Sequence, residues 1–160
     1  MVPRSKLRTK FRTKLRTKAS LSLFVLAALY GGAATAEFRS IGEQATVFYD
    51  APSTRGNKTF VVSRDLPVEI ISTDGTWTKV RDSSGALAWV DRKALSDKRT
   101  VIVSAAVAVV RERADEQARV VFQAQQGVVL DFVDAAGGWA QVRHAGGSAG
   151  YVRIQQVWGL

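Results

Sequence analysis

The chain has 160 residues, which suits one ordinary domain or two very small ones, and its net charge is +9. The charge is uneven: residues 1–36 hold eight basic groups and no acid, and the rest carries 15 basic groups against 14 acidic groups. A folded basic surface of the kind that binds nucleic acid is therefore not indicated. The absence of cysteine excludes disulfides, thiolate zinc sites and a cysteine nucleophile.

The first 36 residues resemble an export signal in their pattern. A repeated basic unit, KLRTKFRTKLRTK (residues 6–18), precedes an uncharged stretch, ASLSLFVLAALYGGAATA. Its densely apolar part, about ten residues, is short of the roughly 20 that span a bilayer. Ala34-Thr35-Ala36 then places small residues at the two positions that signal peptidase reads. We predict a Sec-type signal peptide over 1–36, cleaved near Ala36, and a periplasmic or secreted mature protein.

Two alternatives remain open for this segment. It could stay uncleaved as an N-terminal anchor, which would be the protein's contact with the membrane. Alternatively, Leu7, Phe11 and Leu15 could form the apolar stripe of a basic helix on anionic lipid or nucleic acid. In that case the protein would be a cytoplasmic nucleic-acid binder that uses residues 1–18, and its binding would depend steeply on salt.

The remainder of the chain contains an internal duplication. Residues 74–95, DGTWTKVRDSSGALAWVDRKAL, match residues 136–157, AGGWAQVRHAGGSAGYVRIQQV, without a gap at an offset of 62 positions. The same offset aligns three upstream pairs: Leu66 with Val128, Val68 with Leu130, and Ile70 with Phe132. Apolar residues recur while polar ones drift, as expected for two copies of one fold. We therefore predict domains at 38–96 and 100–160, joined at SDKRT (96–100).

Each copy reads as a series of short strands. Residues 66–71 alternate, and Pro67 should stand at a strand start or on an edge because it cannot donate to a ladder. Asp74-Gly75 and Gly137-Gly138 indicate hairpin turns, and strands are expected on both sides. The closing segments RKAL and IQQV are too short for an α-helix and suit a single 3₁₀ turn.

Four or five short strands in about 60 residues favour a small, partly open barrel. A domain of that size is marginally stable alone, so we expect the two copies to dock. The apolar stretch VIVSAAVAVV (101–110) is the candidate contact between them.

The repeated phrase G-x-W-x-x-V, followed by a glycine turn, an aromatic–Val pair and a closing apolar residue, resembles the bacterial SH3-like domain. It is carried in the first copy by Gly75, Trp77, Val80, Gly85, Trp89, Val90 and Leu95, and in the second by Gly137, Trp139, Val142, Gly147, Tyr151, Val152 and Val157. The resemblance covers residues 38–157. It implies an all-β protein of two tandem five-stranded barrels outside the cytoplasmic membrane, which binds cell-wall or other short peptides. The first copy matches the Gly–aromatic–Val end of the motif less well, because it has Ala88 at the position that Gly150 occupies in the second copy.

Aromatic and cationic residues are the candidate ligand contacts. In a regular strand Trp77, Lys79 and Arg81 share one face, and an aromatic ring beside a cation can hold a peptide carboxylate. The candidate ligand-binding residues are Trp77, Arg81, Trp89, Trp139, Arg143 and Tyr151. The alternative is that each tryptophan packs under a loop or against the sister domain.

Catalytic chemistry is not indicated by the sequence. The one histidine, His144, aligns with Asp82 and leads into a glycine turn, and no G-x-S-x-G phrase is present. No spacing predicts a metal or cofactor site. We expect a module without enzymatic activity that recognises peptidoglycan peptides. The alternatives are an adaptor that binds envelope proteins and a hydrolase that depends on His144.

Overall fold

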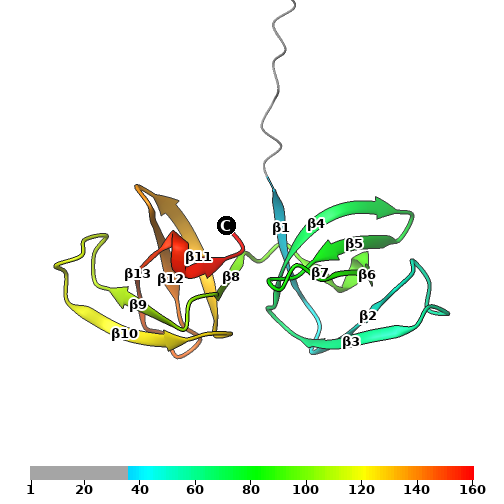
Figure 1. The fold of residues 1–160 in the computed structure, drawn as a ribbon, viewed down its shortest axis with the longest axis horizontal. Coiled ribbons are helices and arrows are strands. Elements are labelled where there is room, and N and C mark those ends of the chain that lie inside the picture. The colour runs from blue at the N-terminus through cyan, green and yellow to red at the C-terminus, as the bar shows by residue number, and fades with distance from the viewer. Residues whose placement is uncertain (1–35) are drawn as a thin grey trace, which may run out of the picture. The chain divides into compact units, whose positions relative to one another are not determined.

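The computed structural model of this protein describes residues 36–160 (Figure 1). The predicted signal peptide lies outside the described residues, apart from Ala36. Among the described residues, no helix has the length and apolarity required to cross a membrane.

Residues 36–160 form two seven-stranded antiparallel sheets, each curled around its own core (Figure 1). The first sheet has the order β3-β2-β6-β5-β4-β1-β7 and the second β10-β9-β13-β12-β11-β8-β14. The first contains β1 (Glu37–Ile41), β2 (Ala45–Tyr49), β3 (Lys58–Ser63), β4 (Pro67–Asp74), β5 (Trp77–Arg81), β6 (Leu87–Asp91), the 3₁₀ turn η1 (Arg92–Ala94) and β7 (Leu95–Ser96). The second contains β8 (Thr100–Val103), β9 (Val107–Arg111), β10 (Val120–Gln125), β11 (Val129–Ala136), β12 (Trp139–Arg143), β13 (Ala149–Arg153), η2 (Ile154–Gln156) and β14 (Val157–Trp158).

The predicted fold class, two tandem SH3-like β domains, is confirmed, but each sheet has seven strands rather than five. The additional strands are the first and last of each copy. β1 pairs with β7 through Ser40 opposite Ser96, and β8 pairs with β14 through Val103 opposite Val157. The closing strands span two residues each, which is too short for a period of two to be visible in the sequence.

The offset of the sequence repeat is kept in the three-dimensional structure. β5 and β12 begin 62 positions apart, at Trp77 and Trp139, and the 3₁₀ turns predicted for RKAL and IQQV stand at the same offset. Even a break in register recurs, between Ile70 and Ser72 in β4 and at the equivalent place in β11. Pro67 is the first residue of β4, as its missing N–H requires.

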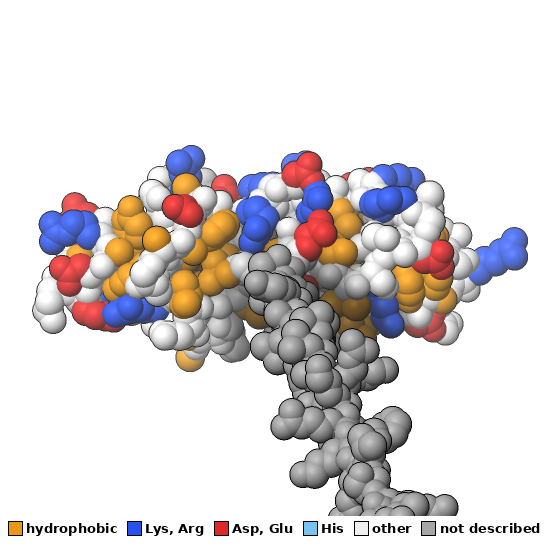
Figure 2. Space-filling model, turned by 90° about the horizontal axis from the view of Figure 1, so that it is seen from above, with side chains coloured by type: hydrophobic (Ala, Val, Ile, Leu, Met, Phe, Trp, Pro, Cys, Tyr) orange, Lys and Arg blue, Asp and Glu red, His pale blue; other side chains and the backbone are white. Residues whose placement is uncertain are grey.

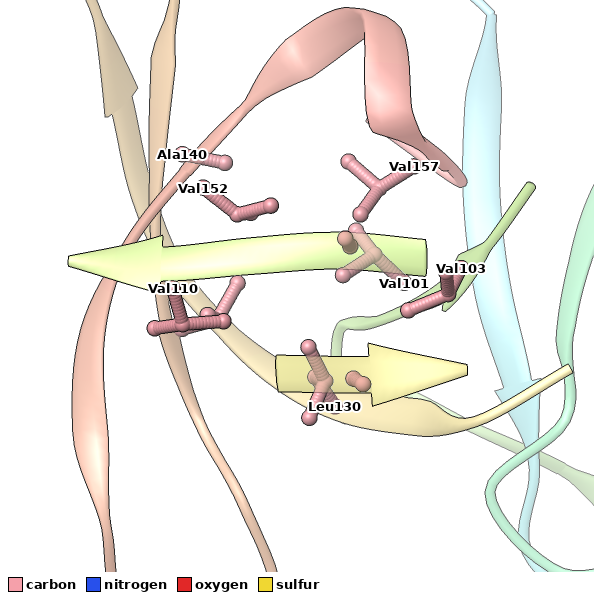
Figure 3. Packing of buried hydrophobic residues seen from close by; sticks show 10 residues of the cluster. Val101, Val103, Val110, Leu130, Ala140, Val152 and Val157 are labelled. Atoms are coloured by element: carbon pink, nitrogen blue, oxygen red, sulfur yellow. The ribbon is translucent and has the colours of Figure 1, made fainter. Parts of the chain in front are cut away.

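Each sheet buries one face of alternating apolar residues. The first core consists of Ile41, Phe48, Val68, Val80, Ala88, Val90 and Ala94. The second consists of Val101, Val103, Ala108, Val110, Ala124, Leu130, Ala140, Val142, Val152 and Val157 (Figure 3). The two clusters share no residue, so each copy has its own hydrophobic core.

Most of the stretch 101–110 packs within the second copy rather than against the first. Val101, Val103, Ala108 and Val110 are all buried inside the second core (Figure 3). The reason is that the stretch contains two strands, β8 and β9, and each turns its alternate residues toward the interior of its own sheet. Ile102 is the exception: it is buried outside this core and stands opposite Trp158 of β14, whose ring meets that of Phe38 on β1 at 5.0 Å between centroids.

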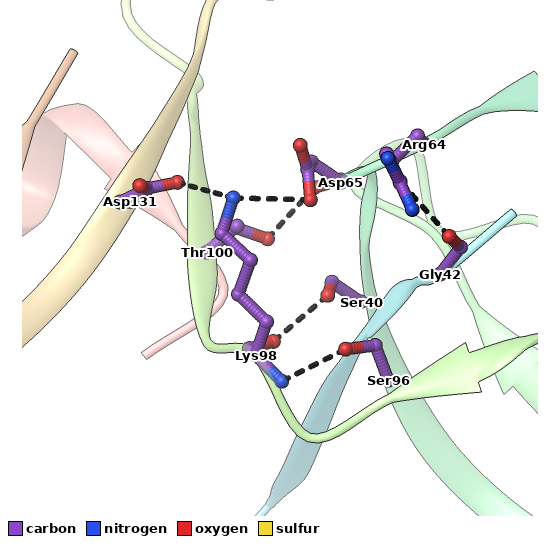
Figure 4. Close-up of polar contacts among 8 residues, drawn as sticks. All are labelled: Ser40, Gly42, Arg64, Asp65, Ser96, Lys98, Thr100 and Asp131. Carbon is purple, nitrogen blue, oxygen red and sulfur yellow. Dashed lines mark hydrogen bonds and ion pairs between the residues drawn. The ribbon is translucent and has the colours of Figure 1, made fainter. Parts of the chain in front are cut away.

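Polar contacts surround the segment that joins the two copies (Figure 4). The Nζ of Lys98 lies 2.8 Å from Oδ1 of Asp131 and 3.1 Å from Oδ1 of Asp65. Ser40 donates to the backbone oxygen of Lys98, and Thr100 donates to the backbone oxygen of Asp65, each at 2.8 Å. The hydrogen bond to Asp131, and then that to Asp65, raise the pKa of Lys98 above its ordinary value, so its charge is stabilised.

Candidate functional site

The candidate residues lie on the outer face of β5 and β12. Val80 and Val142 are fully buried, so the alternate residues of both strands point away from the core. On this outer face Lys79 stands opposite Trp89 of β6, and Gln141 stands opposite Tyr151 of β13. The tryptophans and their cross-strand neighbours therefore share one surface in each copy.

In the first copy, four half-buried side chains form what we call the Trp77 platform: Tyr49, Trp77, Lys79 and Trp89. Tyr49 and Trp77 meet edge to face, with 5.5 Å between ring centroids and 87° between ring planes. The Nζ of Lys79 lies 5.9 Å from the centre of the Trp89 ring. Ring faces beside an ammonium group can hold an apolar or carboxylate-bearing ligand.

Arg81 is not a free contact on this surface. Its Nε and Nη2 lie 2.9 and 3.0 Å from the two carboxylate oxygens of Glu69 on β4. This two-point pairing satisfies the guanidinium within the first copy, so the cation beside the platform is Lys79. The pairing follows from the register of β4 and β5, which places Glu69 opposite Arg81.

The equivalent surface of the second copy is covered by its own side chains. Trp139 is 5% exposed, and the guanidinium of Arg153 lies 4.1 Å above its ring. Glu116, from the loop between β9 and β10, holds this guanidinium through Nε and Nη2, both at 2.6 Å. The first copy has Asp91 at the position of Arg153 and Thr54 at that of Glu116. Trp139 is therefore covered by Arg153 and the loop residue Glu116, and the first copy lacks both of these residues at the equivalent positions.

Tyr151 and Arg143 lie on the outer face of the second copy without forming a joint site. Tyr151 is half-buried and lines a pocket of about 200 Å³ with Ala114, Asp134, Ala136, Trp139 and Gln141. Arg143 is exposed at the end of β12, and its cross-strand neighbour Asp131 pairs with Lys98 instead.

The structure thus brings Trp77 and Trp89 together and adds two residues that the candidate set lacked. Tyr49 reaches the platform because β2 pairs with β6 at Trp89. Lys79 carried a signal in the sequence, since it lies between Trp77 and Arg81 on the same face. Tyr49 was only a weak aromatic candidate in the sequence, because its place beside Trp89 depends on the pairing of two strands distant in sequence.

His144 is an exposed turn residue directly after β12. Its Nδ1 accepts a hydrogen bond from the backbone N–H of Gly146 at 3.1 Å, and its ring centre lies 5.9 Å from that of Phe122. Within residues 36–160, no group of three His, Cys, Asp or Glu side chains is placed to hold a metal ion. Catalysis and metal binding therefore find no support at this residue.

Charges of both signs are interleaved on the visible surface. Figure 2 shows hydrophobic side chains on this face bordered by Lys, Arg, Asp and Glu, without a broad field of one sign. This distribution agrees with the nearly neutral balance of residues 37–160, 15 basic against 14 acidic. Contacts with rings and local ion pairs, rather than a long-range basic field, are thus the available means of recognition.

Two small curled sheets, each with an aromatic outer face and a closing 3₁₀ turn, define a tandem SH3-like protein. The family model described as the bacterial SH3 domain matches residues 43–97 and again residues 104–159. The chain therefore belongs to the bacterial SH3 domain family. No curated protein matches the sequence.

Several solved structures are similar to this chain. NlpC1 from Trichomonas vaginalis is 12% identical with a TM-score of 0.37, and the match covers 77% of this chain and 45% of that one. NlpC2 from the same organism has 11% identity, a TM-score of 0.35 and coverage of 78% and 48%. An NlpC/P60 family protein from Bacillus cereus ATCC 10987 has 12% identity, a TM-score of 0.36 and coverage of 76% and 56%. The match spans about half the length of these chains.

Proposed function

We propose that this protein is an exported binding module that recognises cell-wall peptides and performs no catalysis itself. The observation that carries the proposal is the Trp77 platform, an accessible cluster of three aromatic rings and a lysine on a bacterial SH3 domain. Aromatic side chains that stay half-exposed on a rigid sheet bury large areas at small entropic cost when a ligand covers them.

The proposal assigns recognition to the first copy. Its ring faces have no cover comparable to Arg153 over Trp139, so a ligand does not need to displace an ion pair. The ammonium group of Lys79 is placed to meet a carboxylate of a peptide lying across Trp89. The second copy, with its covered tryptophan, supports the fold rather than this contact.

Retention on purified cell wall tests the binding proposal. Trp89→Ala should weaken retention roughly tenfold or more, as the loss of a central aromatic contact does. Tyr151→Ala, the same position in the second copy, is the matched control and should leave retention unchanged. Wall material stripped of its peptides should retain neither the wild-type protein nor the Tyr151→Ala variant. Equal retention of both variants, or binding to the stripped wall, would contradict the proposal.

Export is a separate part of the proposal and has its own test. It rests on the basic and apolar segments before Ala36 and on the small residues at Ala34 and Ala36. We expect the protein from fractionated cells to have the mass of a chain that starts at Glu37. We also expect to find it outside the cytoplasmic membrane. An intact N-terminus in the membrane fraction would favour the anchor instead.

A further inference from the structure

A pocket of about 160 Å³ lies on the side of β5 opposite the Trp77 platform. It is lined by Glu37, Arg39, Ile70, Thr73, Thr78, Arg92 and Leu95, from β1, β4, β5, η1 and β7. Ile70 and Leu95 supply apolar walls, and the other five residues are polar or charged. The volume is below the roughly 300 Å³ at which sites for drug-sized ligands begin, so the pocket suits one small group.

An unpaired hydroxyl lies at this pocket. Thr78 is 1% exposed, and its Oγ1 has no hydrogen-bond partner within the described residues. A buried hydroxyl without a partner is costly, which makes it a strong donor for any acceptor that enters. Thr78 points inward because its neighbours on β5, Trp77 and Lys79, occupy the outer face.

Arg92 supplies a positive charge without a carboxylate partner among residues 36–160. Its Nη2 donates to the backbone oxygen of Gly75, and its side chain forms no other hydrogen bond within the described residues. The nearby Glu37 is already 3.1 Å from Arg39, and Asp97 also pairs with Arg39. Both acidic groups are therefore already paired with Arg39, whereas Arg92 has no carboxylate partner among the described residues.

The second copy does not repeat this polar pocket. It carries apolar residues at four of the five polar or charged positions: Val101 for Arg39, Ala135 for Thr73, Ala140 for Thr78 and Ile154 for Arg92. Val101 and Ala140 belong to the second core, and Ile154 packs against it. Because the same fold closes this position with apolar side chains, the polar set of the first copy is not required by the fold.

We propose that this pocket binds the carboxylate of a small apolar acid, with Arg92 as its ion-pair partner and Thr78 Oγ1 as a hydrogen-bond donor. The shared chemistry is that of a peptide C-terminus whose last residue has a small side chain, or of a free short-chain acid. Ile70 and Leu95 contact the apolar part of either ligand. A charge-assisted pair and one neutral donor match the two oxygens of a carboxylate.

Titrations followed by NMR test this site on the protein as the cell makes it. N-Acetylalanine represents the peptide C-terminus, propionate the free acid, and N-acetylalaninamide lacks the carboxylate. We expect saturable shifts at Thr78 and Arg92 with the two acids and none with the amide. Tighter binding of N-acetylalanine would assign the peptide C-terminus, and equal or tighter binding of propionate would assign the free acid. Binding of the amide as tightly as the acids would overturn the proposal.

Two variants with a matched control separate binding from folding. Thr78→Val removes the hydroxyl without changing the shape, and Arg92→Gln removes the charge; each should weaken N-acetylalanine binding about tenfold or more. Thr46→Val is the control, because Thr46 Oγ1 is also buried without a partner but does not line this pocket. It should leave binding unchanged. Unchanged binding in Thr78→Val, or an equal loss in Thr46→Val, would contradict the assignment.

The inference stands apart from the Trp77 platform. Trp89→Ala removes a platform residue on the outer face and should leave the shifts at Thr78 intact. Loss of wall retention with intact N-acetylalanine binding would therefore separate the two sites. Absence of saturable shifts in the wild-type protein would overturn the pocket without affecting the platform.

Discussion

Gly150 and Ala88 occupy the same position of the repeat, and their surroundings show why one copy has glycine there. A Cβ on Gly150 would overlap the backbone oxygen of Arg111 and lie 2.8 Å from Cγ1 of Val110. Both atoms belong to β9, which pairs with β13 at Tyr151. Ala88 fits at the equivalent place in the first copy and is buried there. The departure from the repeat therefore reflects how closely two strands approach in the second copy.

This close approach predicts the effect of a single methyl group. Gly150→Ala should destabilise the second copy by about 1–3 kcal/mol, since overpacking forces β9 and β13 apart. Urea unfolding monitored at residues of the second core measures the change. Ala149→Ser, on the exposed neighbouring residue of β13, should change stability by less than about 0.5 kcal/mol. If Gly150→Ala left the free energy of unfolding unchanged, β9 would be able to shift and accommodate the methyl group.

Among the strands, β3 is the least protected by the fold. It stands at the end of the first sheet and pairs with β2 alone within residues 36–160. Phe60 is 54% exposed and Val61 is 70% exposed, so the strand presents apolar side chains next to an unpaired backbone edge. Such edges favour pairing with another chain. In the second copy the equivalent strand, β10, starts with Val120, which is 42% exposed.

A charge on β3 should therefore reduce self-association. We expect Val61→Lys to lower light scattering of the concentrated protein while leaving its unfolding midpoint unchanged, because the side chain is exposed. Ser63→Lys adds the same charge at the end of the strand and should have a smaller effect. Equal scattering by the wild type and Val61→Lys would mean that this edge does not mediate association.

Across the whole molecule, the separation of the two cores is the dominant feature. The core residues of each copy come from its own sheet. Between the copies, the contacts at Lys98 are polar and partly exposed, and one aromatic pair, Phe38 with Trp158, meets edge to face at 5.0 Å between ring centroids. Partly exposed ion pairs contribute little to stability, with typical values of about 0–1 kcal/mol. A destabilising substitution in one core should therefore mainly destabilise the copy that contains it.

Hydrogen exchange can test this independence. Val142→Ala should cost about 2–3 kcal/mol through lost burial and a cavity, and the loss of protection should be confined to the second copy. Val133→Ala, at a position that is 51% exposed on β11, is the control and should have little effect. An equal loss of protection in the first copy would show that the two cores unfold as one unit.

The two tryptophans show how far the candidate site could be predicted. The repeat placed Trp77 and Trp139 on equivalent strands and on the same outer face, and the structure agrees. The sequence repeat could not predict that the ring of Trp139 is covered and the ring of Trp77 is not. That difference depends on Arg153 and Glu116, which are 37 residues apart and meet only when the loop after β9 folds back over β13. The pairing of Arg81 could not be predicted either, because its partner Glu69 comes from a neighbouring strand.

The sequence alone determined the duplication, the all-β class and the inward positions of each strand, because a period of two and a repeated offset follow from local backbone geometry. Only the tertiary structure decided which rings stay accessible, which arginines are already paired, and where a buried hydroxyl such as that of Thr78 is left without a partner. These properties depend on contacts between side chains brought together by strand register and loop packing, and the polar residues that make them are those that differ between the two copies.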